Sequence, residues 1–328
     1  MAIEMRVERG DIVAFSADVL ALKFAQNLYG VDDYVVSLLM EAGISEGSLR
    51  PEPGNFSLVP SKGAVTASSV LLTGVNKLSE FGYQEIRKFA RSVLAILRTA
   101  APITEHVCMT LHGANFGLDE VEAFQSEVAG LLEAVQDGEY PPKLRRISIV
   151  ERNSRRAERL SIALTELLPK MTLSPTEGLG GFSSTARQQL RSVGYASEGR
   201  PHVFVAMPFA QEMDDTFHYG IQGAVRNAGY ICERADLSTF TGDILDWVRR
   251  RIKTAELLVA DLTTANPNVY LEVGYAWGCE VPTVLLAKSP ADLKFDVRAQ
   301  KCIIYKSIKD LEEKLTGELT KLSDNHSV

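Results

Sequence analysis

The sequence lacks the cysteine and histidine patterns of several protein classes. Its four cysteines, Cys108, Cys232, Cys279 and Cys302, are widely spaced and include no C-x-x-C pair. This spacing is typical neither of a disulfide framework nor of a zinc site, and it fits a reducing compartment. The five histidines show no metal-ligand spacing with the cysteines. We therefore predict neither a metal nor a bound cofactor.

Long apolar runs and an excess of positive charge are also absent. No apolar segment approaches the roughly 18–20 residues of a membrane-spanning helix. The opening segment MAIEMRVERGDIVAF interrupts its apolar residues with charges, so we expect no signal peptide and no membrane attachment. Lys and Arg number 35 against 42 Asp and Glu, which gives a net charge of −7. Bulk nucleic-acid binding needs cations that neutralise phosphates, so we expect instead a soluble, cytoplasmic protein that does not bind nucleic acid in bulk.

The composition is that of a globular protein with a sizeable core. Of its 328 residues, 45% are hydrophobic and 23% are charged. A typical domain length of about 150 residues predicts two domains. The clearest composition shift is a stretch at 169–200 that is rich in Gly, Ser, Thr and Pro. We interpret this stretch as a linker, with a short helix near 186–193, between domains at 1–168 and 201–328.

Both domains alternate between the apolar patterns of strands and of helices. In the first domain we expect strands at 18–24, 69–75, 106–113 and 145–151, and helices at 83–100 and after an Asp119-x-x-Glu122 capping box. In the second we expect strands at 202–207, 230–235, 256–262, 281–287 and 301–307, and helices at 214–229, 242–254, 267–278 and 307–322. Such alternation indicates parallel sheets covered by helices on both faces. The predicted fold class is therefore α/β: two three-layer α/β domains, the second a flavodoxin-like doubly wound parallel sheet.

Three loops that follow strands of the second domain contain candidate site residues. Met207, Pro208 and Phe209 follow the first strand, the stretch from Asp236 to Asp243 follows the second, and Asp261 ends the third. In an open α/β sheet the ligand crevice lies at the carboxyl ends of the strands. We therefore expect all three loops to open toward one crevice.

The helix that follows the third strand contains a carboxylate that needs an explanation. Asn266 is a good N-cap and Pro267 a good first helical residue. On the helix that they begin, Asn268, Glu272 and Tyr275 share a face beside an apolar stripe. Burying an unpaired carboxylate is costly or raises its pKa. Glu272 is therefore either a glutamate at the solvent edge or capped by backbone, or a catalytic acid or nucleophile at the crevice floor.

The segments VFVAMPF, ADLTTANPNVYLEVGYAWGCEVPTVLLA and KFDVRAQKCIIY resemble the nucleoside 2-deoxyribosyltransferase-like family, which is related to TIR-like domains. The resemblance covers the second domain. It implies that Glu272 is the nucleophile and that Asp261 handles the departing base or the sugar. It also implies that an aspartate contacts the sugar, with Asp243 and Asp246 as the candidates. The Met-Pro-Phe loop at 207–209 departs from the pattern of the family's enzymes and leaves the substrate open.

The chemistry that this resemblance implies breaks an N-glycosidic bond through an oxocarbenium-like transition state. A carboxylate beneath the anomeric carbon stabilises the positive charge and can form a covalent glycosyl ester, as in retaining O-glycosidases. Water as the acceptor gives a hydrolase and a second base gives a transferase, and the sequence does not decide between them. The candidate substrate contacts, besides the two aspartates, are Met207, Pro208, Phe209, Asn266, Asn268 and Tyr275.

The opening of the first domain, RGDIVAFSADVLALKFAQN, resembles that of a macro-type domain, a fold shared with the N-terminal regions of leucine aminopeptidases. Macro domains bind ADP-ribose-like ligands through glycine loops at strand ends. The matching candidates are Gly74 and Asn76 in one turn and His112, Gly113 and Gly117 in another. Alternatively, these glycines only turn the chain, and His112 is a hydrogen-bonded loop histidine.

The sequence leaves three functions open, in this order of preference. The first is an N-glycosidase or NADase-like enzyme that acts on a nucleoside, nucleotide or NAD-like small molecule, as a bacterial defence or conflict effector whose N-terminal domain binds a nucleotide signal. The second is a non-catalytic module that senses ADP-ribose-like nucleotides, in which Glu272 recognises a ribose hydroxyl. The third is a housekeeping nucleoside deoxyribosyltransferase. Because related enzymes often complete one another's sites, we also expect a homo-oligomer.

Overall fold

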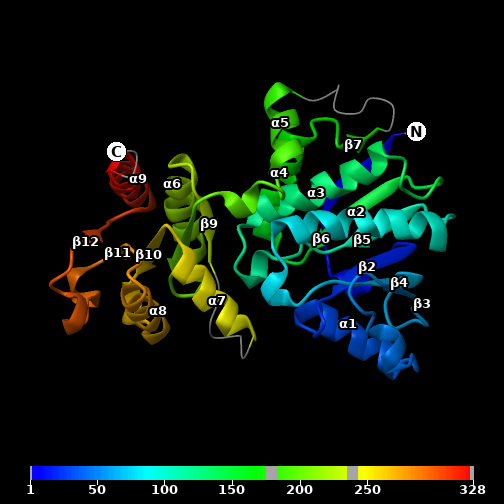
Figure 1. Ribbon diagram of the computed structural model, residues 1–328, viewed down its shortest axis with the longest axis horizontal. Coiled ribbons are helices and arrows are strands. Elements are labelled where there is room, and N and C mark those ends of the chain that lie inside the picture. The colour runs from blue at the N-terminus through cyan, green and yellow to red at the C-terminus, as the bar shows by residue number, and fades with distance from the viewer. Residues whose placement is uncertain (1, 175–182, 235–242, 326–328) are drawn as a thin grey trace. The chain divides into compact units, whose positions relative to one another are not determined.

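The computed structural model describes residues 2–174, 183–234 and 243–325, and these form two compact α/β units (Figure 1). The first unit comprises Met1–Ala114 and Glu120–Glu198, and the second comprises Asn115–Asp119 and Gly199–Val328. The fold class predicted from the sequence is confirmed, since each unit has a sheet with helices packed against it. Among the described helices, none combines the length and the apolar character needed to cross a membrane.

The sheet of the first unit has seven strands in the order β3-β4-β2-β5-β6-β1-β7. They are β1 (Ile3–Arg9), β2 (Val19–Phe24), β3 (Phe56–Pro60), β4 (Ser69–Gly74), β5 (His106–Met109), β6 (Arg146–Glu151) and β7 (Thr172–Leu173). The five central strands are parallel, and β3 and β7 pair antiparallel at the two edges. The sequence analysis anticipated β2, β4, β5 and β6 but not β1, β3 or β7.

Helices cover both faces of this sheet (Figure 1). They are α1 (Gly30–Glu41), α2 (Tyr83–Ala100), α3 (Glu120–Gln136), α4 (Ser154–Leu167) and α5 (Ser184–Ser192). On one face, Val35 and Leu39 of α1 share a core with Leu20 and Leu22 of β2. The buried stripe predicted for α2 lies against α3, so these two long helices form a close pair.

The stretch predicted as a linker contributes two elements to the first unit. Within the described part of 169–200, β7 pairs with β1, and α5 begins after Ser183, whose side chain accepts a hydrogen bond from the amide of Ala186. The buried guanidinium of Arg87 on α2 donates to the carbonyl of Val193 and lies 2.6 Å from the carboxylate of Glu133. This ion pair and its backbone contact fasten the end of α5 to α2 and α3.

The sheet of the second unit has five parallel strands in the order β12-β11-β10-β8-β9. They are β8 (His202–Ala206), β9 (Ile231–Glu233), β10 (Leu257–Asp261), β11 (Thr283–Ala287) and β12 (Cys302–Ile304). Numbered within the unit, the order is 2-1-3-4-5, which is that of flavodoxin-like folds. The predicted doubly wound sheet is therefore confirmed.

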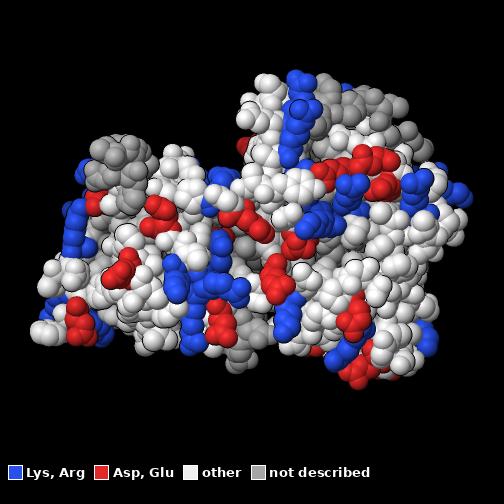
Figure 2. All heavy atoms as spheres, viewed as in Figure 1, with Lys and Arg blue, Asp and Glu red and all other residues white. Residues whose placement is uncertain are grey.

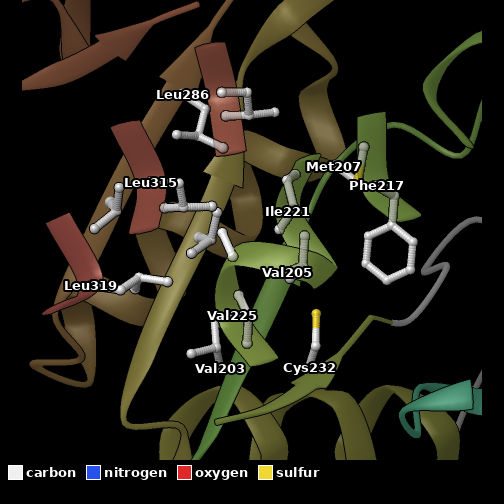
Figure 3. Packing of buried hydrophobic residues seen from close by; sticks show 14 of the residues in the cluster. Val203, Val205, Met207, Phe217, Ile221, Val225, Cys232, Leu286, Leu315 and Leu319 are labelled. Carbon is white, nitrogen blue, oxygen red and sulfur yellow. The ribbon is translucent and has the colours of Figure 1, made fainter. Parts of the chain in front are cut away.

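The helices of the second unit lie where their apolar spacing predicts. A π-helical segment at Thr216–Ile221 continues into α6 (Gln222–Asn227), and α7 (Asp243–Thr254), α8 (Pro267–Gly278) and α9 (Ile308–Asn325) follow. Figure 3 shows Val203 and Val205 of β8 in one core with Val225 of α6 and Leu315 of α9. Helices α7 and α8 contact each other, and Lys and Arg side chains gather over α7 (Figure 2).

Candidate functional site

The candidate site is built on the carboxyl ends of two neighbouring strands in the second unit. Strands β8 and β10 pair in register at Ala206 and Ala260. Met207, which follows β8, and Asp261, which ends β10, are therefore adjacent across the sheet. The chain leaves β8 and β10 in opposite directions, toward β9 and β11, and this switch point is where open α/β sheets bind their ligands.

The carboxylate of Asp261 is fully buried and is held by two donors. The backbone N–H of Thr263 donates to Oδ1 over 2.9 Å, and the hydroxyl of Tyr305 donates to Oδ2 over 2.7 Å. Burial raises the pKa of Asp261, while hydrogen bonds from the Thr263 side chain, from Tyr305 and from the Thr263 backbone, together with the charge of Lys288, oppose the rise. The site thus contains a carboxyl group with a perturbed pKa and a fixed orientation.

The loop after Asp261 has an unusual backbone and starts helix α8. Thr264 and Ala265 have φ angles of 67° and 51°, in the left-handed region that non-glycine residues seldom adopt. Asn266 then caps the helix, and its side-chain oxygen accepts from the amide of Asn268 over 2.9 Å. The helix begins at Pro267, as the sequence predicts. A strained, well-anchored loop therefore sets where α8 starts.

Glu272 lies on the sheet-facing side of α8 and is only 5% exposed. It is buried together with Val269, Val273 and Ala276, and α8 contacts β8, β10 and β11. This excludes the interpretation of Glu272 as a glutamate at the solvent edge. Asn268, which was expected to share its face, is exposed. The helix that starts after Asp261 thus has one carboxylate on its buried face.

The strand-end loop after β8 contains an aromatic residue that stacks on a cation. Phe209, 46% exposed, has its ring centroid 3.7 Å from the guanidinium carbon of Arg234, and the ring of Phe217 lies 4.4 Å from the same carbon. The sulfur of Met207 is 3.7 Å from Nη1 of Arg234, and Pro208 is buried. Sequence reasoning missed Arg234, although its place directly after β9 follows the same strand-end rule.

The remaining candidates of the second unit lie on or beside α7. Asp246 is exposed and pairs with Arg249 one turn further along the helix, at 3.2 Å. Tyr275 is half-buried on α8, and burial together with a hydrogen bond to Cys279 raises its pKa. Asp243 begins α7, but its side chain lies outside the described part of the structure, as does all of Asp236.

In the first unit, Gly74 ends β4 and Asn76 follows it. A Cβ atom on Gly74 would lie 2.1 Å from the carbonyl oxygen of Glu52, so only glycine permits this close backbone approach. Asn76 is exposed. The close approach gives Gly74 a packing role whether or not a ligand binds nearby.

His112 is buried in the first unit rather than presented to solvent. Its ring packs edge-on against Phe89, with centroids 4.5 Å apart, and Nδ1 lies 3.5 Å from the carboxylate of Glu127. Neither ring nitrogen has a hydrogen-bond partner among the described residues. Gly113 and Gly117 have φ angles of 87° and 104°. These positive φ angles match the alternative that the glycines turn the chain.

Gly117 lies in the short segment that belongs to the second unit. Its carbonyl accepts from the backbone N–H of Arg234 over 3.0 Å. In the same segment, Asp119 pairs with Arg226 and accepts from the amide of Cys232. Among the described residues, no group of three or more His, Cys, Asp or Glu side chains is placed to hold a metal.

No protein-family model matches the chain, and no curated protein matches it. Among solved structures it is similar to the CMP N-glycosidase BcmB of Clostridium botulinum, with 18% identity over 36% of this chain and 98% of that chain and a TM-score of 0.31. It is also similar to a Trypanosoma brucei macrodomain in complex with ADP (14% identity, 49% of this chain and 69% of that chain, TM-score 0.39). An Oceanobacillus iheyensis macrodomain with MES bound is a further neighbour (12% identity, 50% and 92%, TM-score 0.39). The structural neighbours thus include an N-glycosidase and macrodomains.

Proposed function

We propose that the second unit cleaves the N-glycosidic bond of a nucleoside, nucleotide or NAD-like molecule, with Glu272 as the nucleophile. The observation that carries this proposal is the burial of Glu272 on the sheet-facing side of the helix that begins just after Asp261. A carboxylate held out of water at a strand-end switch point is the group that such chemistry requires.

In the proposed reaction, Glu272 attacks the anomeric carbon as the bond to the base breaks. The base leaves with the electron pair of the C–N bond, while Asp261 binds the departing base or the sugar. The base of a nucleoside or nucleotide takes up one proton from water, whereas the nicotinamide of an NAD-like molecule leaves neutral and needs none. Water then attacks the glycosyl ester, which releases the sugar and restores the Glu272 carboxylate. The surrounding protein has a low dielectric constant, so the negative carboxylate stabilises the cationic transition state more strongly than it would in water.

The test incubates the full chain with NAD⁺, with nucleosides and with nucleoside monophosphates, and measures the released free base by chromatography. Glu272→Gln keeps the size of the side chain but removes the nucleophilic charge, so we expect a loss of at least about 10³-fold in rate. The matched control is Glu313→Gln, an exposed glutamate on α9 that should leave the rate unchanged. A wild type that releases no base, or a Glu272→Gln variant that is still active, would refute the proposal.

For the first unit we propose a nucleotide-sensing role that regulates the second, as in a defence effector. Its parallel strands also have a switch point, between β2 and β5, because the chain leaves them toward β4 and β6. A buried Lys23–Asp32 ion pair lies near the end of β2, and His112 follows β5. Calorimetry with ADP-ribose and with adenine nucleotides tests this role, and the absence of binding by the full chain would contradict it.

A further inference from the structure

Tyr305 lies at the carboxyl end of a strand in the sheet of the second unit and was not among the candidates found in the sequence. It follows β12 directly and is 1% exposed. Its hydroxyl donates to Oδ2 of Asp261 over 2.7 Å and lies 3.4 Å from Oγ1 of Thr263. Oγ1 of Thr263 in turn accepts from the backbone N–H of Lys288 over 3.1 Å. One chain of hydrogen bonds therefore joins the ends of β10, β11 and β12.

A tyrosine hydroxyl has a single proton, and Tyr305 gives it to Asp261. The hydroxyl of Thr263 lies beside both groups: it is 3.4 Å from the hydroxyl of Tyr305, and the Thr263 side chain also hydrogen-bonds the carboxyl group of Asp261. Two hydroxyls and one backbone N–H therefore converge on the Asp261 carboxyl group.

Asp261 is thus held from two sides and retains capacity for a further partner. The backbone N–H of Thr263 holds Oδ1 and Tyr305 holds Oδ2, so the carboxylate cannot rotate without losing both contacts. An ionised carboxylate has about four acceptor positions, so the donors of Thr263 and Tyr305 do not fill them all. Because Asp261 is fully buried, a substrate hydroxyl or base that uses a remaining position must displace the groups that cover it.

We propose that Tyr305 is a positioning residue for this site and holds the carboxyl group of Asp261 in the orientation that meets the substrate. The inference rests on the proposed function, since the substrate is the one that Glu272 would attack. Tyr305 does not itself touch the reacting atoms in this proposal. It acts through Asp261.

The electrostatics of the cluster give the inference a measurable signature. Burial raises the pKa of Asp261, and the hydrogen bond from Tyr305 is one of the interactions that lower it. Removing the hydroxyl should therefore raise the pKa of Asp261 further. Burial also raises the pKa of Tyr305, so the phenol remains a donor at neutral pH. The other charges that act on this pair are those of Lys288 on Asp261 and of Asp292 on Tyr305, and both residues are intact in the variants below. The charge of Asp261 in turn raises the pKa of the neighbouring Cys302 thiol.

The test is Tyr305→Phe in the full chain, which deletes one hydroxyl and leaves the ring. We expect kcat to fall about tenfold or more, with KM changed less than about twofold, and the acidic limb of the pH profile to move to higher pH. The matched control is Tyr270→Phe. The hydroxyl of Tyr270 donates to the carbonyl of Asp292 and accepts from the backbone N–H of Lys294. The control variant therefore measures the effect of losing a tyrosine hydroxyl that hydrogen-bonds backbone groups rather than Asp261. Equal changes in both variants, or an unmoved pH limb in Tyr305→Phe, would overturn the inference.

A second measurement separates this inference from the proposed function. Titration of the Asp261 carboxyl carbon by NMR needs no activity, and we expect a higher pKa in Tyr305→Phe than in the wild type. An unchanged pKa overturns the inference even if the enzyme is active, and a raised pKa supports the contact even if no base is released. If Tyr305→Phe does not fold, Thr263→Val should shift the same pKa in the same direction, because the Thr263 side chain also lowers the pKa of Asp261. No shift in that variant counts against the inference.

Discussion

Replacing Gly130 by alanine should destabilise the first unit, because α2 and α3 touch backbone to backbone at this residue. A Cβ atom on Gly130 would lie 2.1 Å from the carbonyl oxygen of Arg87 and 3.1 Å from the Cβ of Ala90. An ordinary contact at such a position is at least 3.4 Å, so the helices must separate by more than an ångström. Since the obstacle is backbone, no side-chain rotation relieves it, and the cost should lie near the upper end of the usual overpacking range, about 3 kcal/mol.

That cost should appear as a lower melting temperature of the first unit, by about 6–12 °C for a unit of this size. Far-UV circular dichroism follows the helices of both units, and the fluorescence of Trp247 and Trp277 distinguishes the transition of the second unit from that of the first. The matched control is Gly317→Ala on α9, where an added Cβ meets no atom within 4 Å. Alanine is the better helix former there, so this variant should gain about 0.5–1 kcal/mol. A Gly130→Ala variant that gained stability, or lost none, would contradict the backbone contact between α2 and α3 at this residue.

Two further predictions concern ionisable groups of the second unit, where both tryptophans, Trp247 and Trp277, report unfolding by fluorescence. Arg251→Met removes two 2.7 Å hydrogen bonds and a positive charge from the fully buried Glu233, and should cost about 3–5 kcal/mol in urea denaturation. A loss below about 1 kcal/mol, the value of an exposed ion pair, would contradict this expectation. Burial lowers the pKa of His202, so the unfolded chain binds more protons just below pH 6.5 and stability should fall as the pH drops through that region. His202→Gln should flatten this dependence, and an unchanged slope would show that another group causes it.

Local spacing was enough to predict most helices and the buried strands, but not strands whose charges are satisfied by distant partners. The segment of β1, IEMRVER, contains four charged residues and does not resemble an interior strand. In the structure, Glu4 pairs with Arg146 and Glu8 accepts from the hydroxyl of Ser148, both on the neighbouring strand β6. These cross-strand contacts join residues about 140 positions apart, and no window along the sequence contains them. The two-residue strand β7 is too short to produce any periodic signal.

Asp119 shows the same difference between local spacing, which the sequence reveals, and distant contacts, which it does not. Its spacing from Glu122 predicts a helix start, and α3 does begin at the next residue. Its carboxylate, however, also binds Arg226 and the amide of Cys232, more than a hundred residues away. The sequence could therefore place Asp119 at the start of the correct helix, but it could not show that its side chain contacts residues of the second unit.

The two carboxylates of the candidate site, Glu272 and Asp261, also differ in whether local spacing or a distant residue determines their surroundings. This difference bears on the proposed chemistry. Helical spacing places Glu272 beside the apolar stripe of Val269, Val273 and Ala276, but it leaves open whether the carboxylate lies at the solvent edge or against the sheet. The environment of Asp261 depends instead on Tyr305, which the chain supplies 44 residues later from a different strand. A change in β12 can therefore alter Asp261 while leaving the helix with Glu272 in place. If the two groups act in one reaction, substitutions in β12 should change the pH dependence of that reaction more than they change the folding of α8.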